Sequence, residues 1–137
     1  MDLNGKFVIA VITRDETRIW STDAKRGDIP TTIALPPVDH HHVREAQHHG
    51  GHESTKNDRP YHEAIAQALR PAGEILLIGH GKGKGNSMLQ FVQFLESHHH
   101  DIAAHVVGTV EEDIVAMTEP EILAAARKWI AAHRTFI

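Results

Sequence analysis

Residues 75–85, with the sequence ILLIGHGKGKG, decide the fold. The four residues 75–78 are all apolar and do not alternate with polar ones, which is typical of a parallel strand buried on both faces. After the glycines and lysines, Ser87 and Gln90 have the spacing of a helix capping box. They open an apolar stripe at helical spacing, formed by Met88, Phe91, Val92 and Leu95. We therefore predict a buried strand, a loop and a helix, the repeating unit of an α/β sheet.

Three strands are predicted on the amino-terminal side of this unit. Residues 6–13 contain an uninterrupted apolar run and predict a central strand. Residues 17–22 are rich in β-forming residues and predict an antiparallel hairpin with it. Residues 29–35 alternate as a third strand. This strand contains or adjoins Pro30, Pro36 and Pro37. We place it at an edge of the sheet because proline has no backbone N–H to donate to a neighbouring strand.

Helices alternate with strands along the rest of the chain. A helix is predicted to be capped by Asp58, with Pro60 in its first turn, and to end at Pro71. Residues 102–107 predict a further parallel strand. A second capping box opens the last helix, whose cap and apolar face are Thr118 and Glu121, then Ile122, Ala126, Trp129 and Ile130.

The order β-β-β-α-β-α-β-α predicts an α/β fold. Right-handed crossovers place the first strand beside the fourth, in a ribonuclease-H-like mixed five-stranded sheet covered by helices. The third and the last strands lie at edges, where they are candidate pairing sites for a homo-oligomer. A two-metal nuclease, which this outline suggests, would need acidic residues on the central strands, and residues 7–12 and 75–78 contain none.

The composition fits a single domain that spans residues 1–137. Of the 137 residues 41% are apolar and none is cysteine, which excludes a disulfide framework, a thiol nucleophile and a thiolate metal site. No apolar run reaches the roughly 18 to 20 residues of a membrane span, and residues 1–6 lack the pattern of a secretory signal. We expect a cytoplasmic protein with no membrane partner.

Histidine is unusually frequent, with 13 residues, whereas the formal net charge of −4 does not by itself indicate a nucleic-acid binder. Residues 38–57 have no apolar periodicity and are predicted to form a mobile His/Gly-rich loop. Adjacent histidines point apart, so we expect no cofactor and only adventitious Zn or Ni affinity. A His-rich metal-binding protein is the alternative function, with candidate ligands His40, His41, His42, His48, His49 and His52.

The remaining histidines have simpler interpretations. His98, His99 and His100 follow a helical stripe, and the helix dipole favours positive groups at a helix carboxyl end. His105 lies in the predicted strand 102–107 and is interpreted as a core residue, whereas His62 and His133 are interpreted as helix-surface residues.

The glycine-rich segment between the buried strand and the capped helix is a candidate phosphate site. Backbone N–H groups and the positive end of a helix dipole favour an anion at such a place, and two lysines add charge. The spacing matches neither a Walker A motif nor G-x-G-x-x-G, so a tight turn with solvated lysines is the alternative. The candidate phosphate- or RNA-binding residues are Gly79, Gly81, Lys82, Gly83, Lys84 and Arg59.

With these elements, the chain resembles the middle domain of the eukaryotic and archaeal class-1 peptide release factor and of its relative Pelota. More closely, it resembles the small stand-alone bacterial relatives described as translational machinery proteins. The resemblance covers about residues 6–133. It rests on the meander, Gly50-Gly51 before the first helix, residues 75–84, Val106-Val107-Gly108 and Thr118-Glu119-Pro120-Glu121.

The resemblance implies a partner and a possible chemistry. In release factors of this family the loop before the first helix carries Gly-Gly-Gln, which enters the peptidyl-transferase centre and helps position water against the peptidyl-tRNA ester. Here the corresponding residues are Gly50-Gly51-His52, so the glutamine is missing. We expect a protein that binds the ribosome or a structured RNA rather than a catalyst. Peptidyl-tRNA ester hydrolysis with His52 as the catalytic residue is the alternative.

Overall fold

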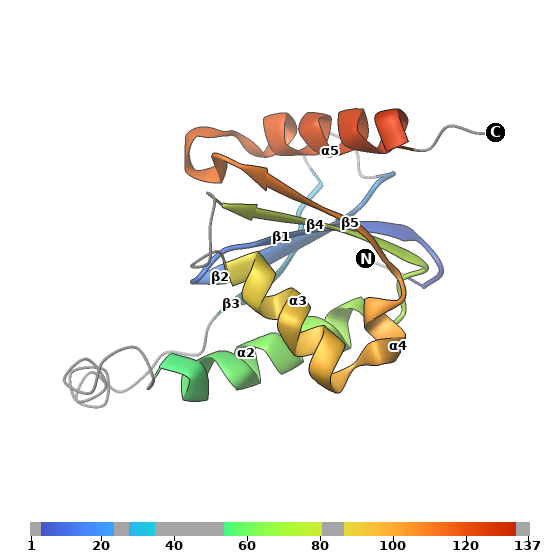
Figure 1. Ribbon diagram of the computed structural model, residues 1–137. Coiled ribbons are helices and arrows are strands. Elements are labelled where there is room, and N and C mark those ends of the chain that lie inside the picture. Colours follow the sequence, from blue (N-terminus) through green and yellow to red (C-terminus); the bar gives the residue numbers. More distant parts are fainter. Residues whose placement is uncertain (1–3, 24–27, 35–53, 81–86, 134–137) are drawn as a thin grey trace.

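The computed structural model describes residues 4–23, 28–34, 54–80 and 87–133, and for residues 54–58 the backbone alone. One mixed sheet has the strand order β3-β2-β1-β4-β5 (Figure 1). Strand β1 (Phe7–Ile12) is antiparallel to β2 (Glu16–Ser21), which is antiparallel to β3 (Thr31–Ala34). The predicted meander is confirmed.

The carboxyl-terminal half adds two parallel strands and the helices. Strand β4 (Glu74–His80) is parallel to β1, and β5 (Val106–Glu112) is parallel to β4. The predicted mixed five-stranded sheet, with the first strand beside the fourth, is confirmed. Helices α2 (Ser54–Leu69), α3 (Ser87–His98) and α4 (His100–Ala103) cover one face, and α5 (Glu119–His133) covers the other (Figure 1).

The core lies on both faces of β1 and β4. Alternate residues of these strands pack toward α2 and α3, among them Val8, Ala10 and Leu77. The residues between them pack toward α5, among them Ile9 and Leu76. Because both faces of β1 and β4 are buried, every residue of these two runs must be apolar, which is why apolar and polar residues do not alternate there.

Helix α2 begins before the predicted cap. Asp58 lies inside the helix and Pro60 is an interior residue rather than part of the first turn. Proline removes one i→i−4 hydrogen bond, a local loss that leaves the turns on either side intact. The apolar stripe indicates where α2 is buried, from Tyr61 onward, and the stripe need not coincide with the start of the helix.

The predicted strand 102–107 was wrong in its first half. Ile102 and Ala103 belong to α4, and β5 begins at Val106. A short apolar run fits a helical turn and a strand equally well, so periodicity cannot distinguish them. His105 accordingly precedes the strand and is exposed rather than in the core, and its Nδ1–H donates to the carbonyl oxygen of Gly73 at 2.8 Å.

His62 was predicted on a helix surface but is buried, with 7% of its surface exposed. Its ring centroid lies 5.7 Å from that of Phe91 and 5.5 Å from that of Phe94, because α3 packs across this side of α2. His133 is exposed on α5 as predicted, and it stacks on Trp129 with 3.9 Å between ring centroids.

The capping box of α5 is confirmed. Thr118 N–H donates to Glu121 Oε1 at 2.8 Å, and Glu121 N–H donates to Thr118 Oγ1 at 3.3 Å. These two contacts satisfy backbone donors that the first helical turn would otherwise leave unpaired.

Candidate functional site

The carboxyl ends of β1 and β4 lie side by side at one end of the sheet. Gly79, near the end of β4, is buried and paired with Ile12 of β1 on one side and Glu111 of β5 on the other. Residues 81–86 connect this end of the sheet to the first residue of α3, Ser87. Ligands of open α/β sheets bind outside the carboxyl ends of the strands, so this end is the candidate site.

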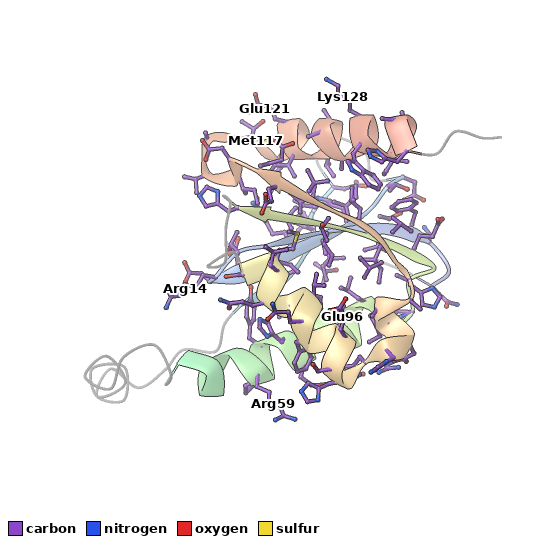
Figure 2. All side chains as sticks on the ribbon, viewed as in Figure 1. Arg14, Arg59, Glu96, Met117, Glu121 and Lys128 are labelled. Atoms are coloured by element: carbon purple, nitrogen blue, oxygen red, sulfur yellow. The ribbon has the colours of Figure 1, made fainter. Side chains whose placement is uncertain are left out.

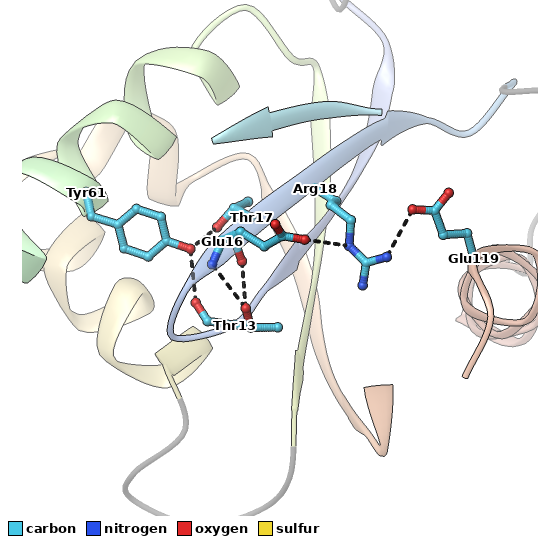
Figure 3. Close-up of polar contacts among 6 residues, drawn as sticks. All are labelled: Thr13, Glu16, Thr17, Arg18, Tyr61 and Glu119. Carbon is cyan, nitrogen blue, oxygen red and sulfur yellow. Dashed lines mark hydrogen bonds and ion pairs between the residues drawn. The ribbon is translucent and has the colours of Figure 1, made fainter. Parts of the chain in front are cut away.

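Tyr61 ties the amino-terminal half of α2 to this end of the sheet (Figure 3). Its hydroxyl donates to the carbonyl oxygen of Thr13, the residue after β1, at 3.0 Å. Since that proton is committed to a carbonyl, the hydroxyl of Thr17 must donate to Tyr61 Oη, 2.9 Å away. Tyr61 and Thr17 are both buried, so this pair of bonds holds α2 in one position over the β1–β2 hairpin.

Arg18 links the same hairpin to the opposite layer (Figure 3). Its Nη1 donates to Glu119 Oε2 at the start of α5, at 3.0 Å, and its Nε lies 3.7 Å from Glu16 Oε2. The guanidinium carbon also lies 5.7 Å from the centroid of the Trp20 ring. The end of β1 is thus connected to helices on both faces of the sheet, a rigid base for a site.

His80, the last residue of β4, is exposed, and its side chain contacts residues that follow β5. Its Nδ1 accepts a hydrogen bond from Ile114 N–H at 3.1 Å, and Asp113 Oδ1 lies 3.8 Å from the same nitrogen. Because Nδ1 is the acceptor, the proton of the neutral ring is on Nε2. The ring orientation is therefore set by the backbone that follows β5.

Charge is divided across this end of the molecule. The turn after β1 carries both signs, Arg14 and Asp15, and Arg59 is exposed on α2 two residues before Tyr61 (Figure 2). Beyond β4 the balance is acidic, because residues 111–113 are Glu-Glu-Asp. The acidic residues therefore disfavour an anion on the β5 side, whereas Arg14 supplies an exposed cation in the turn after β1.

Two of the residues predicted for the site can be placed. Gly79 lies at this end of the sheet, whereas Arg59 is two residues from Tyr61 on α2 and lies on the side of that helix that faces away from the sheet (Figure 2). Sequence reasoning missed Arg14 and His80. The signal that identifies both is their position just after a central apolar run, where the carboxyl end of a buried strand must meet solvent.

The other predicted site residues lie outside the described part of the chain. For the glycine segment these are Gly81, Lys82, Gly83 and Lys84, and for the loop tip Gly50, Gly51 and His52. The candidate metal ligands His40, His41, His42, His48 and His49 lie outside it as well. The phosphate, loop-tip and metal assignments therefore stay predictions.

A second polar cluster lies where α2 meets α3 and α4. His99 Nδ1 accepts from Arg70 Nη2 at 3.2 Å, so its proton is on Nε2, which donates to Glu63 Oε1 at 2.9 Å. Arg70 also pairs with Asp101. Hydrogen bonding to His99 and then to Gln67 lowers the pKa of Glu63. Glu63 and His99 are half-buried and Arg70 and Asp101 are exposed, and their contacts with one another indicate that the cluster holds the helices together.

Two further properties follow from the described residues. No three histidine or carboxylate side chains among residues 4–23, 28–34, 54–80 and 87–133 are grouped as metal ligands would be. None of the helices in those ranges has the length and hydrophobicity of a bilayer span.

Comparison with known proteins identifies a similar fold. The chain is similar to Archaeoglobus fulgidus Pelota, with a TM-score of 0.54 and 9% sequence identity over 93% of this chain. It spans about a third of the length of that protein, since 32% of Pelota is covered. No protein-family model matches the sequence, and no curated protein matches it. The similarity therefore establishes a Pelota-like α/β fold.

Proposed function

We propose that this chain is a translation-related protein, a relative of the release-factor middle domain, that binds the ribosome or a structured RNA. The proposed contact is the end of the sheet where β1 and β4 finish, with Arg14 in the turn after β1, and it extends to Arg59 on the outer side of α2 (Figure 2). The proposal includes Lys82 and Lys84, which the sequence places between this end and the start of α3.

The observation that carries the proposal is the position of Gly79. A buried glycine is the last residue but one of a central parallel strand, just before a segment rich in glycine and lysine, and a helix of 12 residues begins directly after that segment. Helix amino ends and closely approaching backbone favour phosphate oxygens. The Pelota-like fold supports a ribosomal setting for this chemistry.

Cosedimentation with ribosomes tests the proposal. We expect the chain to pellet with ribosomes at low salt, and more of it below the ordinary histidine pKa of about 6.5 than above, if loop histidines contribute charge. A chain that stays in the supernatant under both conditions would contradict ribosome binding.

A charge-matched pair of variants locates the contact. Lys82→Ala with Lys84→Ala should lower the slope of log affinity against log salt by about 1 to 2, since each phosphate contact contributes about 0.7 to 0.9. The control, Arg127→Ala with Lys128→Ala, removes the same charge from α5 on the opposite face of the sheet (Figure 2). Equal effects of the two pairs would show a general charge effect and would exclude the glycine segment as the contact.

The proposed activity is binding, and hydrolysis is measured separately. We expect His52→Ala to leave both ribosome association and the rate of peptidyl-tRNA ester hydrolysis unchanged. Loss of hydrolysis with retained association would instead establish the catalytic alternative at Gly50-Gly51-His52.

A further inference from the structure

We propose that two copies of this chain associate through the outer edge of β5, which no other described strand pairs with, antiparallel and about a two-fold axis at Thr109, so that one continuous sheet crosses the dimer. Strand β5 is the last strand of the sheet and has 7 residues. Four of them are β-branched: Val106, Val107, Thr109 and Val110. A long edge strand of this composition readily pairs with another strand.

The two edges of the sheet differ in their protection. The other edge strand, β3, has 4 residues and begins directly after Pro30. Proline beside a short edge strand opposes pairing, because it lacks a backbone donor. Strand β5 contains neither proline nor lysine, and its irregularity at Val107 and its two glutamates at the carboxyl end leave Gly108, Thr109 and Val110 between them unprotected. The β5 edge is therefore the one suited to association.

Two exposed apolar side chains lie on β5 or shortly after it, whereas a third, Ile29, precedes β3. Within the described residues, the large hydrophobic side chains that are exposed are Ile29, Val107 and Val115. Val107 lies on β5 and is 42% exposed, and Val115, 82% exposed, follows the strand. Ile75 pairs with Val106 and Leu76 with Gly108, so Val107 lies at an irregularity and has no counterpart on β4. A second copy would cover apolar surface that this fold leaves in water.

Charge selects the antiparallel direction. The carboxyl end of β5 is acidic, with Glu111, Glu112 and then Asp113, whereas exposed His105 precedes its amino end. Parallel pairing would place the acidic ends of the two strands together. Antiparallel pairing about Thr109 directs the acidic end of each strand toward the amino end of the other, which His105 precedes, and this removes that repulsion.

The backbone direction agrees with an axis at Thr109. Ile75 N–H donates to His105 O across the β4–β5 ladder, and peptide groups alternate in direction along a strand, so the amide and carbonyl of Leu77 also face β5. In a parallel pair, a residue whose peptide groups face the neighbouring strand engages the residues on both sides of its partner. The partner of Leu77 is Thr109, whose own amide and carbonyl consequently face away from β4, toward the second copy.

Cysteine crosslinking tests both the edge and the register. The chain contains no cysteine, so a single introduced thiol reports one position. In a directly opposed hydrogen-bonded pair the Cα atoms lie about 5.5 Å apart, within the range of about 4.4 to 6.8 Å that a disulfide spans. We expect Thr109→Cys to give a covalent dimer under mild oxidation at least about tenfold faster than Thr32→Cys, the exposed threonine on β3.

Sedimentation equilibrium of the unmodified chain supplies the second readout. We expect its mass to rise from monomer to dimer with concentration, and Thr109→Lys to abolish the rise because two lysines would face each other at the axis. Thr32→Lys should leave the rise unchanged. A monomer at every concentration, or equal crosslinking of Thr109→Cys and Thr32→Cys, would overturn the proposal. All four variants change an exposed residue, so we expect each to fold, and circular dichroism checks this.

Discussion

Replacement of Tyr61 by phenylalanine tests whether its hydroxyl holds α2 to the end of the sheet. The change removes the bond to Thr13 O at 3.0 Å and the bond from Thr17 at 2.9 Å. Each bond contributes about 1 kcal/mol net, and the Thr17 hydroxyl, which is 0% exposed, would lose its partner. We expect Tyr61→Phe to lower the free energy of unfolding by about 2 to 3 kcal/mol, or Tm by roughly 5 to 10 °C.

A double-mutant cycle in urea separates the hydrogen bond from other effects. Thr17→Val removes the hydroxyl that Tyr61→Phe would leave without this partner. The double variant should therefore lose about 1 kcal/mol less free energy of unfolding than the sum of the losses of the two single variants. Thr31→Val, at an exposed threonine on β3, is the control and should change stability by less than about 0.5 kcal/mol. Additive single changes, or a cost of Tyr61→Phe no larger than that of the control, would refute the reasoning.

Two other positions give independent tests. Gly108→Ala should lower the free energy of unfolding by about 1 to 3 kcal/mol, because a Cβ atom there would overlap the indole ring of Trp129. Thermal unfolding measures this change, and an unchanged Tm would show that the ring is not packed on β5. Glu121→Gln should be less stable than the parent at neutral pH, since hydrogen bonds from the backbone N–H and then the hydroxyl of Thr118 lower the pKa of Glu121 in the folded state. A lowered pKa of Glu121 stabilises the fold at pH values above the ordinary 4.5, and this stability is lost as the pH falls below 4.5. The difference in free energy of unfolding between parent and variant, measured by urea titration, should therefore disappear at low pH. A difference that does not depend on pH would contradict this.

Much of the fold could be predicted because the signals were local. The apolar runs of β1 and β4, the hairpin between β1 and β2, and the Thr118–Glu121 capping box each lie within a few residues of sequence. The site was predictable only in part. Gly79 was predictable from the glycine-rich motif, whereas Arg59 was chosen for its charge and lies on the outer side of α2 (Figure 2). Arg14 and His80 became candidates once the carboxyl ends of β1 and β4 were known to lie at the same end of the sheet.

The errors share one physical cause. Ile102 looked like a strand residue, and His62 looked like a surface residue, because neither pattern includes the neighbour that decides the matter. For His62 that neighbour is α3, whose Phe91 and Phe94 cover the ring. His105 was assigned to the core because its sequence neighbours are apolar, but these neighbours belong to two different elements, α4 before it and β5 after it.

The sequence by itself determined which segments become central strands, in what order they follow one another, and where the last helix begins. The central strands follow from apolar residues that can be buried on both faces, and the start of the last helix follows from side chains that cap its backbone. Each of these signals lies within a single segment of the sequence. Only the tertiary structure decided that Tyr61 reaches Thr13 and Thr17, and that Arg18 reaches Glu119. It also decided that Val107 is exposed on β5, whose outer edge pairs with no other strand of the described residues. Such contacts join residues far apart in the chain, and their geometry exists only after the sheet and its two helical layers have packed.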